Sequence, residues 1–557
     1  MGSITYRSFI AAHDGASGAL KQATRAAVAV VAASLAVPEA RAAAFPAASG
    51  SRYAVATDSA EASHAAVDAL EHGGNAADAA VAAALTLGVV SPAGSGLGGG
   101  GFALVYLKKA GKVVTLDFRE TAPPNVDVAF LSSRTAPVAG DRRAVGIPGE
   151  PWGLEHITTT WGKRTLADNV QYATRLASQG FEVPSHTRAM YTEWGGRLVV
   201  GGELQRALAS GAPRIARPML ARALVEYGAS GATAKDPASA PLETEPLQWD
   251  ALGHTWFSMP LPSAGGMMLR QVTSAASGPL GKWLQTASAG SSSYNHALAE
   301  LFRGALVDRA FFAGDPRLHA WPLNLFEPAR LAARWALFDP NKTTPLRALA
   351  PREHGTSHVV VVDAEGNVVT LTTTINSPFG SGIEDPRTGI LLNDELYDFS
   401  SRAEEEAMGV SSPGPNAPCP YARPVSSMTP TLAFQNGELA FALGGSGGPR
   451  IATGVTQVAL CLALHKREPG ACVAAPRMHV AWDNTVILDD DIALDVQDGL
   501  KARGESVKTA ANGSAVQVVT SNTSEVTSAT KTTTKTKTWL LLKAASDPRK
   551  RGLAIAR

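Results

Sequence analysis

A Gly-Thr-Ser-His step at residues 355–358 opens an apolar, β-branched stretch about two thirds of the way along the chain. Residues 353–376 read EHGTSHVVVVDAEGNVVTLTTTIN. A threonine hydroxyl is a weak nucleophile and needs a base beside it. The α-amine of an N-terminal threonine can be that base, because an α-amine titrates near neutrality, whereas a lysine amine is normally protonated. A cut just before Thr356 would therefore make this residue a nucleophile with its own base.

Gly355 suits such a cut, because a residue without Cβ tolerates a strained backbone and leaves its carbonyl open to attack. The turn at Gly366-Asn367 predicts a hairpin whose facing strands bring Thr374 near Thr356. The alternative is an ordinary loop followed by threonines on a sheet surface, which is how we interpret the two threonines before Thr374. Gly-Thr-Ser alone is too common a tripeptide to decide between these interpretations.

The elements before this hairpin alternate between strands and helices. From about Tyr53 the chain reads as a strand, a helix, a Gly-Gly turn and a small-residue helix at 75–90. Five glycines among residues 96–101 then lead into a strand, where they allow a tight backbone entry or offer amides to a ligand. A dinucleotide fingerprint needs the strand before the glycines and the helix after them, so this order excludes it. Residues 152–330 have a mainly helical pattern.

From Ser357 onward the pattern changes to strands. One of them is predicted at 389–394 (GILLND), and turn signals at 364–367 and 436–437 predict hairpins. A polar tract at 520–538, between two strand-like runs, predicts an elongated hairpin or a polar loop. Antiparallel sheets with helices outside them make a layered α+β sandwich.

Composition narrows the class of protein. Of 557 residues, 45% are hydrophobic and 18% charged, with a net charge of +1, which is typical of a globular enzyme acting on small molecules and indicates neither a nucleic-acid nor an anionic-membrane partner. The three cysteines, Cys419, Cys461 and Cys472, are too few and too irregularly spaced for a zinc site. They are either three structural or unpaired thiols, or one disulfide with a leftover thiol.

The first 44 residues predict a leader with an export signal. Lys21 and Arg25 precede the apolar run AAVAVVAASLAV, and Ala-Arg-Ala at 40–42 resembles a signal-peptidase site. An Ala-rich amphipathic helix or a disordered leader is the alternative. No run reaches the ~20 apolar residues that span a bilayer, so we expect no integral membrane segment. The export signal predicts a periplasmic or secreted location.

Many short motifs resemble the γ-glutamyltranspeptidase family, a branch of the N-terminal nucleophile hydrolases, from about Tyr53 to Arg549. The matching motifs are GGNAADAAVA, GLGGGGF, LDFRETAP, VGIPGEPWG, LPSAGGMML, GTSHVVVVDAEGNVVTLTTTINSPFGSGI, GILLNDELYDFS, RPVSSMTPT, GGSGGPRI, APRMH and ASDPR. Each alone is weak, but their number and order are specific. The resemblance implies a four-layer αββα sandwich with a helical region in the large fragment. It also implies self-cleavage between Gly355 and Thr356 into fragments 45–355 and 356–557, which stay associated as a heterodimer.

The resemblance also implies roles for the catalytic residues. Thr356 would be the nucleophile and its new amine the general base, and Thr374 would hydrogen-bond Thr356 and assist maturation and turnover. Backbone amides of Gly447 and Gly448 would stabilise the oxyanion. Taken alone, these glycines are typical of a plain turn.

A γ-glutamyl group carries an α-carboxylate and an α-ammonium, and the resemblance implies a receptor for each. The carboxylate would be bound by Arg119, whose guanidinium fork matches it, with Ser426 and Ser427 as hydroxyl donors. On the opposite side, the ammonium would be bound by Glu395, Asp398 and Asn376. Taken alone, the two acids are typical of a solvated surface.

The implied activity is a γ-glutamyl hydrolase or transferase acting on glutathione and related compounds. The acyl group would pass to water or to an amino acid or peptide, without a metal or organic cofactor. One alternative is an amidase of other specificity on the same scaffold, such as a β-lactam side-chain acylase, and another is an unprocessed, inactive binding protein. Two departures from the family are Ser357, where many relatives carry a second threonine, and the poorly matching lid segment 401–422.

Overall fold

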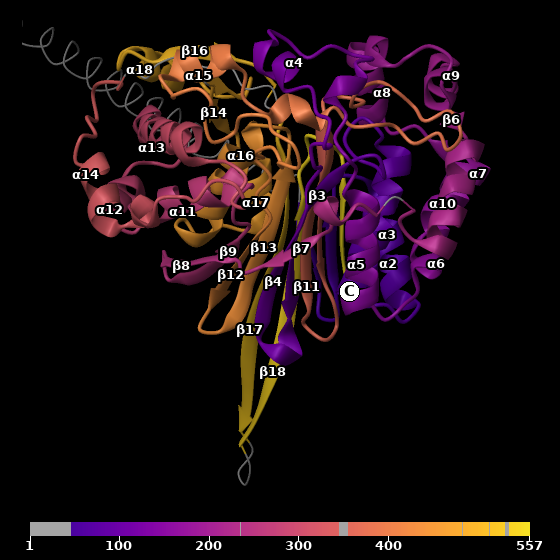
Figure 1. Ribbon diagram of the computed structural model, residues 1–557. Helices are drawn as coiled ribbons and strands as arrows, with labels where there is room; N and C mark the ends of the chain where they lie inside the picture. Colours follow the sequence, from indigo (N-terminus) through magenta and orange to yellow (C-terminus); the bar gives the residue numbers. More distant parts are fainter. Residues whose placement is uncertain (1–45, 234, 345–354, 482, 512, 530–533) are drawn as a thin grey trace, which may run out of the picture.

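Two seven-stranded antiparallel sheets form the centre of the molecule, with helices on both outer sides (Figure 1). The computed structural model describes residues 46–557 except 234, 345–354, 482, 512 and 530–533. The predicted leader, with its export signal, therefore lies outside the described residues. So does the segment that immediately precedes Gly355.

The first sheet is built mainly from the second half of the chain. Its strand order is β1 (Ala48–Gly50), β18 (Thr534–Ser546), β17 (Ala515–Ala529), β13 (Glu438–Ser446), β12 (Thr431–Gln435), β9 (His254–Ser258) and β8 (Leu247–Ala251). Strands β17 and β18 pair with each other from Gln517 with Ser546 to Ala529 with Thr534. This long hairpin projects from the body of the molecule (Figure 1), so the elongated hairpin that the polar tract predicted is confirmed.

The second sheet contains the hairpin that opens at Gly355. Its strand order is β19 (Leu553–Ala556), β2 (Ala54–Thr57), β10 (Gly355–Val362), β11 (Val368–Asn376), β3 (Gly100–Leu107), β4 (Lys112–Phe118) and β7 (Leu242–Thr244). Strand β10 pairs with β11 on one side and β2 on the other, and β11 also pairs with β3. The predicted hairpin is confirmed, and its two strands are the centre of this sheet.

Alternating valines of β10 explain why the sheets stack. Val359 and Val361 pack with the helices outside the second sheet, whereas Val360 and Val362 pack with residues of the first sheet. Successive side chains of a strand point to opposite faces, so a strand that is apolar on both faces must be covered on both. This requirement produces four layers, and the predicted αββα sandwich is confirmed.

Helices cover the second sheet on its outer face. The small-residue helix predicted at 75–90 is α3, and Asn75 caps it by accepting hydrogen bonds from Ala77 N and Asp78 N. The helices of this side are α2 (Ala60–Glu71), α3 (Ala76–Val90), α5 (Glu150–Trp161), α6 (Leu166–Asn169), α7 (Gln171–Gln179), α8 (Ser185–Trp194), α9 (Glu203–Ala209) and α10 (Pro218–Ser230). A short pair, β5 (Phe181–Glu182) and β6 (Arg214–Ile215), lies among them.

The outer face of the first sheet is covered by a second group of helices. These are α11 (Ala264–Ala276), α12 (Pro279–Thr286), α13 (Ser292–Phe312), α14 (Pro328–Trp335), α16 (Arg450–Ala463), α17 (Pro469–Ala474) and α18 (Leu494–Lys501). A small sheet of β14 (Met478–Val480), β15 (Thr485–Leu488) and β16 (Ser506–Thr509) packs beside them. Helices α4 (Val128–Ser133) and α15 (Arg402–Met408) lie above the sheets in Figure 1.

One strand prediction was wrong. Residues 389–394 form only an isolated bridge, between Glu384 and Leu391, and no strand. Their main chain bonds instead to nearby loops: Leu392 N donates to Ile383 O, and Asn393 N donates to Gly98 O. Leu391 is buried by packing of a loop, and Ile390 and Leu392 are half-buried. Periodicity alone does not distinguish such a loop from a buried strand.

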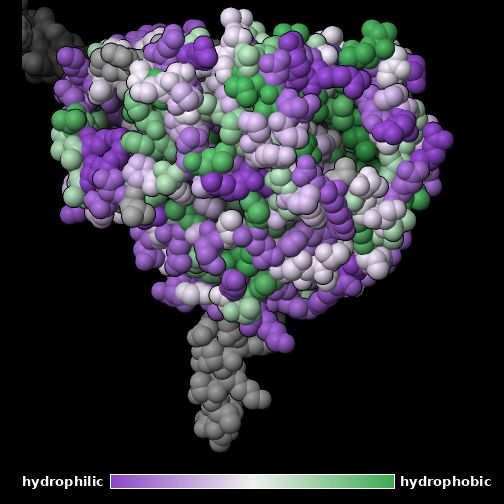
Figure 2. All heavy atoms as spheres, viewed as in Figure 1, coloured by the Kyte–Doolittle hydropathy of each residue, from purple (hydrophilic) through white to green (hydrophobic). Residues whose placement is uncertain are grey.

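Of the two alternatives for the cysteines, one disulfide with a leftover thiol is the one that the structure shows. Cys461 and Cys472 form a disulfide with a Cα–Cα distance of 5.6 Å, and Cys419 is a free thiol. Within the described part of the chain, no helix is both long and apolar enough to cross a bilayer. Polar residues cover most of the face in Figure 2, and apolar residues occur among them in small patches.

Candidate active site

Residues from six separate segments meet in one narrow, buried cavity of about 10 Å³. The cavity is lined by Arg119, Gly355, Thr356, Thr374, Asn376, Glu395, Asp398, Ser426, Met428, Gly448 and Ile451. Nine of these are residues that the sequence singles out. Ser427 and Gly447 are the neighbours of lining residues and do not line the cavity themselves. The apolar wall of Met428 and Ile451 was missed, although both lie within the quoted motifs RPVSSMTPT and GGSGGPRI.

Gly355 and Thr356 begin strand β10. The residue before Thr356 has to be glycine for packing, because a Cβ there would lie 2.6 Å from Ala93 O and 2.8 Å from Asn376 O. The pairing of β10 with β11 is irregular between Gly355 and Ser357, which leaves Thr356 outside the regular ladder. The peptide bond between Gly355 and Thr356 therefore lies in a tight and irregular part of the strand.

The hydroxyl of Thr374 points at this peptide bond. Thr374 Oγ1 donates to the carbonyl oxygen of Gly355 at 2.5 Å and accepts from Asn376 N at 2.8 Å. The resemblance implied a hydrogen bond from Thr374 to Thr356, whereas in the structure the hydroxyl of Thr374 donates to the carbonyl oxygen of Gly355. A donor at that oxygen stabilises the negative charge that forms when the carbonyl is attacked.

Arg119 follows β4 and is almost completely buried, with 1% of its side chain exposed. It donates to Glu395 through Nη1 and to Asp398 Oδ2 at 2.6 Å through Nη2. Its Nε donates to Pro424 O at 3.2 Å. The acids were expected opposite Arg119, and the structure instead brings them into direct contact with it. The site is thus a compact set of one cation and two carboxylates.

Burial changes the charge balance of this set. It raises the pKa of Glu395 well above the usual value, although Arg119 opposes the shift. Glu120, the next residue after Arg119, lies with Oε2 3.7 Å from Arg119 Nη1, and burial raises its pKa to about 7. Sequence reasoning missed Glu120. The signals for it were its position beside Arg119 and its place in the motif LDFRETAP.

The two serines differ in their partners. Ser426 is held by its main chain, since its N donates to Pro262 O at 2.9 Å, and its Oγ accepts from Met428 N at 3.1 Å. The Oγ of Ser427 is buried and has no hydrogen-bond partner among the described residues. Such an atom is costly to bury unpaired.

Gly447 and Gly448 lie between β13 and α16. Both have positive φ values, 122° and 61°, a region that favours glycine. A Cβ on Gly447 would lie 2.6 Å from Gly513 O. Consecutive glycines in such conformations can present main-chain amides to an anion.

The glycines at 96–101 have a packing role. A Cβ on Gly98 would lie 2.0 Å from Leu391 O, and one on Gly99 would lie 1.9 Å from Thr374 O. Asn393 completes this contact, because its Nδ2 donates to Gly98 O at 2.7 Å and its Oδ1 accepts from Glu395 N at 3.0 Å. Of the two possibilities for this glycine run, the tight backbone entry into a strand describes the structure. The close contacts of these glycines position the loop that carries Glu395.

The predicted lid segment, 401–422, packs beside the acids. It begins with α15 and contains Asn416, whose Nδ2 donates to Asp398 O at 2.7 Å. Asn416 Oδ1 also accepts from Val425 N at 3.0 Å. Its aromatic residue Tyr421 is 41% exposed. The segment therefore braces the main chain of the site and presents Tyr421 at the surface.

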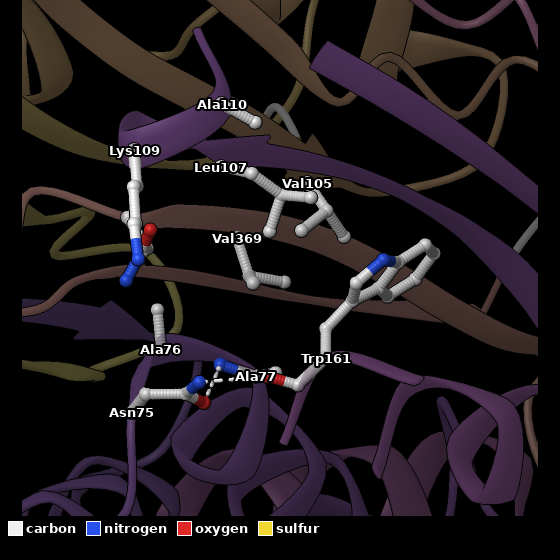
Figure 3. A pocket seen from close by; sticks show the side chains of 10 residues that line it. Asn75, Ala76, Ala77, Val105, Leu107, Lys109, Ala110, Trp161 and Val369 are labelled. Atoms are coloured by element: carbon white, nitrogen blue, oxygen red, sulfur yellow. Dashed lines mark hydrogen bonds between the residues drawn. The ribbon is translucent and has the colours of Figure 1, made fainter. Parts of the chain in front are cut away.

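A larger cavity, of about 480 Å³, lies at the other end of the same strands (Figure 3). Val105, Leu107 and Val369 line it, whereas the candidate active site lies at the opposite end, where Thr374 of β11 pairs with Gly100 of β3. The polar group of Asn75 at its floor is already used, because it caps α3 and donates to Trp161 O at 2.7 Å. The chemistry-bearing residues thus gather in the smaller cavity.

Comparison with known proteins identifies the family of this chain. The family model described as gamma-glutamyltranspeptidase matches residues 62–200 and 214–557. Glutathione hydrolase 2 of Arabidopsis thaliana is 33% identical over 534 residues, covering 84% of this chain and 88% of that protein. The glutathione hydrolase proenzyme of Pseudomonas aeruginosa is 31% identical over 478 residues, covering 79% and 85%.

Two further similarities involve acylases. The acylase ACY 1 proenzyme of Pseudomonas sp. (strain SE83) is 30% identical over 506 residues, covering 83% of this chain and 88% of that protein. The crystal structure of cephalosporin acylase from Bacillus halodurans superposes with a TM-score of 0.77 at 20% identity, covering 92% and 97% of the two chains, which shows a shared fold. With the family model spanning most of its length, this chain belongs to the γ-glutamyltranspeptidase family.

Proposed function

We propose that this protein is a γ-glutamyl hydrolase or transferase that matures by cutting its own chain between Gly355 and Thr356. The observation that carries the proposal is the hydrogen bond from Thr374 Oγ1 to the Gly355 carbonyl, in the same cavity as Arg119. Glutathione and related γ-glutamyl compounds are the proposed substrates. Relatives named glutathione hydrolase support this choice.

Maturation begins with attack of Thr356 Oγ1 on the Gly355 carbonyl carbon. The hydroxyl loses its proton, the C–N bond breaks, and the nitrogen of Thr356 takes up a proton, which leaves an ester between Gly355 and the threonine oxygen. Water then hydrolyses the ester, releasing the Gly355 carboxylate, the Thr356 hydroxyl and a free α-amine. Thr374 supports both attacks by donating to the carbonyl oxygen.

The two fragments, 45–355 and 356–557, stay joined as a heterodimer after the cut. Strand β10 of the small fragment lies between its own β11 and β2 of the large fragment, and β11 pairs with β3 of the large fragment. Separating the fragments would expose the ladder hydrogen bonds and the apolar faces of both strands. Their association is therefore part of the core of the fold.

Turnover uses the new α-amine as the base. The amine takes the proton of Thr356 Oγ1, which attacks the γ-carbonyl of the substrate, and main-chain amides of Gly447 and Gly448 stabilise the oxyanion. The protonated amine then gives its proton to the leaving nitrogen, and an ester remains on Thr356. Water or the amine of an amino acid or peptide attacks this ester and regenerates the hydroxyl.

The substrate's amino-acid head group binds at the charged set. Its α-carboxylate pairs with Arg119 and accepts from Ser426 and Ser427, and its α-ammonium donates to Glu395, Asp398 and Asn376. A carboxylate and an ammonium on one carbon match a cation and acids in direct contact, because each charge of the ligand meets its opposite within one small cavity.

An amidase of other specificity is the second candidate function, and the 30% identity to acylase ACY 1 favours it. Arg119 with its two acids favours the γ-glutamyl function, because an acyl group without an amino-acid head carries no charges that could pair with these side chains. An unprocessed, inactive binding protein is the third interpretation. These alternatives make different predictions for the same purified protein.

The experiment combines gel electrophoresis, N-terminal sequencing and two chromogenic substrates. Two fragments with Thr356 at the start of the smaller one, together with release from a γ-glutamyl anilide, support the proposal. Release only from an acyl anilide without an amino-acid head group would favour the amidase, and one uncut, inactive band would favour the binding protein. Thr356→Ala is expected to abolish both the cut and turnover, and Thr159→Ala, at an exposed helical threonine, is the control.

We also propose an exported, periplasmic or secreted location. The disulfide between Cys461 and Cys472 supports it, because disulfides persist in oxidising compartments and are rare in the cytosol. Cell fractionation of the expressed full chain tests this, and recovery of the mature protein with the cytosolic markers would contradict it.

A further inference from the structure

The side chain of Lys550 contacts the main chain of Thr356 from close to the C-terminus. Its Nζ donates to the Thr356 carbonyl oxygen at 2.6 Å and to Asp58 Oδ2 at 3.0 Å. Lys550 lies in the turn at 548–551 after β18, and Asp58 lies directly after β2. Three segments that are distant in the sequence therefore meet beside the proposed nucleophile.

Two residues that closely precede Lys550, Asp547 and Arg549, are fixed by ion pairs. Asp547 accepts from Arg477 Nη2 at 2.5 Å, and Arg549 Nη2 donates to Asp489 Oδ2 at 2.5 Å. Asp547 and Arg477 are both buried. The turn thus has little freedom, and Lys550 is directed at Thr356 by the fold.

Asp58 is held as firmly as the lysine that it pairs with. Its Oδ1 accepts from Gln517 Nε2 at 2.6 Å, and its Oδ2 accepts from His358 N at 3.3 Å. Only 1% of the Asp58 side chain and 10% of the Lys550 side chain are exposed. A buried pair of this kind needs further hydrogen bonds to offset its desolvation. Here the Thr356 carbonyl supplies one of them.

The other titratable groups near Thr356 are either uncharged histidines or the charged residues that line the active-site cavity. Burial, with a smaller contribution from Lys550, lowers the pKa of His358 to about 3 and that of His186 to about 4. Both imidazoles are therefore uncharged at neutral pH. Arg119, with its two acids, lines the active-site cavity, whereas Lys550 and Asp58 do not. Lys550 contacts the main chain of Thr356, and Asp58 pairs with Lys550.

Building on the proposed self-cleavage, we propose that Lys550 is a positioning residue that holds the main chain of Thr356 and keeps its liberated α-amine in the neutral, proton-accepting form. Three covalent bonds separate this amine from the carbonyl oxygen that Lys550 contacts, so the ammonium lies within about 6 Å of the amine nitrogen. A like charge at this range disfavours protonation of the amine. Asp58 moderates the effect by pairing with the same ammonium.

The test is the pH dependence of kcat/KM on a γ-glutamyl anilide for Lys550→Met, Lys550→Arg and Asp58→Asn. Without the lysine charge, the acid limb of Lys550→Met is expected to move to higher pH by about one unit. Lys550→Arg keeps the charge and is expected to keep the limb near that of the wild type. Asp58→Asn leaves the cation unpaired and is expected to move the limb to lower pH. A general loss of structure would not produce opposite shifts.

Lys543→Met is the matched control, because this lysine lies on β18 and pairs at the surface with Glu468. The inference is wrong if Lys550→Met is cut and active but the acid limb of its kcat/KM profile superimposes on that of the wild type. If Lys550→Met folds but remains uncut, the holding role is supported and Asp58→Asn decides the charge effect. A wild-type protein that is uncut and inactive would instead contradict the proposed function, so the two failures are distinguishable.

Discussion

Thr374 Oγ1 donates a 2.5 Å hydrogen bond to the carbonyl oxygen of Gly355, across the hairpin of β10 and β11. This contact links the second hydroxyl of the hairpin to the peptide bond before Thr356. It is also buried, since 3% of Thr374 is exposed. Removing the donor should therefore weaken stabilisation of the attacked carbonyl without water replacing it.

Thr374→Ala is expected to slow self-cleavage by about 10²–10³-fold, the usual cost of losing one oxyanion donor. The rate is measured from the appearance of the two fragments on a gel after synthesis or refolding. Thr374→Ser keeps the hydroxyl and is the matched control, expected to cut at a rate much closer to the wild type. Equal self-cleavage rates for the alanine and serine variants would show that the hydroxyl of Thr374 does not assist the cut.

Arg119→Lys is expected to spare self-cleavage and to raise KM for a γ-glutamyl anilide by roughly 10–100-fold. The reason is that lysine replaces a planar, two-bond contact with a single point charge, and hydrogen bonds to charged groups contribute about 1.5–3 kcal/mol. Steady-state kinetics of the cut protein measure the change. Arg143→Lys, at an exposed arginine paired with Asp141, is the control. An unchanged KM would mean that Arg119 does not bind the carboxylate.

Glu150, which does not line the active-site cavity, is expected to make the stability of the protein depend on pH. It is buried and accepts from Thr373 Oγ1, and burial raises its pKa to about 8. Below the unfolded-state pKa, about 4.3, the carboxyl is protonated in both states. Between that pH and about 8, unfolding releases a proton, so Glu150 makes the protein progressively less stable as the pH rises.

Glu150→Gln should remove this dependence, because an amide resembles the protonated acid and does not titrate. Its melting temperature is expected to match that of the wild type near pH 4 and to exceed it increasingly up to pH 8. Thermal unfolding at several pH values measures the difference. Glu226→Gln, at an exposed position on α10, is the control. A variant that is less stable than the wild type at pH 8 would contradict the prediction.

A buried ionic network joins the two proposed fragments. Arg303 of α13 pairs with Glu505 through two nitrogens and with Glu300 at 2.7 Å, and His296 Nδ1 lies 2.9 Å from Glu505 Oε1. The histidine and the two acids could also form a metal site by their spacing, but both carboxylates already accept from Arg303. Arg303 therefore supplies the positive charge that an ion would otherwise bring to these carboxylates.

Arg303→Ala is expected to lower the free energy of unfolding by about 3–5 kcal/mol, because it leaves buried carboxylates without their cation. Urea denaturation measures the loss, and Arg222→Ala, at an exposed arginine, should change the free energy of unfolding by less than about 0.5 kcal/mol. EDTA should leave the wild-type melting temperature unchanged. A decrease in melting temperature with EDTA, restored by added metal, would show that the three residues bind an ion.

The sequence by itself determined the hairpin at 355–376, because β-branched residues flank a clear turn and the first strand is apolar on both faces. Its motifs resemble a known family in their order, and that resemblance implied the four layers and nine of the residues that line the cavity. The hairpin and the motifs are local properties. Periodicity, turn chemistry and residue type express them within short stretches of chain.

Only the tertiary structure decided which polar atoms meet. It placed Thr374 on the carbonyl of Gly355, brought Arg119 into contact with its acids, and made 389–394 a loop. It also directed Lys550 to a carbonyl 194 residues earlier in the chain. Such contacts depend on how sheets and loops pack across long separations, and a side chain's partner there is set by burial and geometry that no short stretch of sequence encodes.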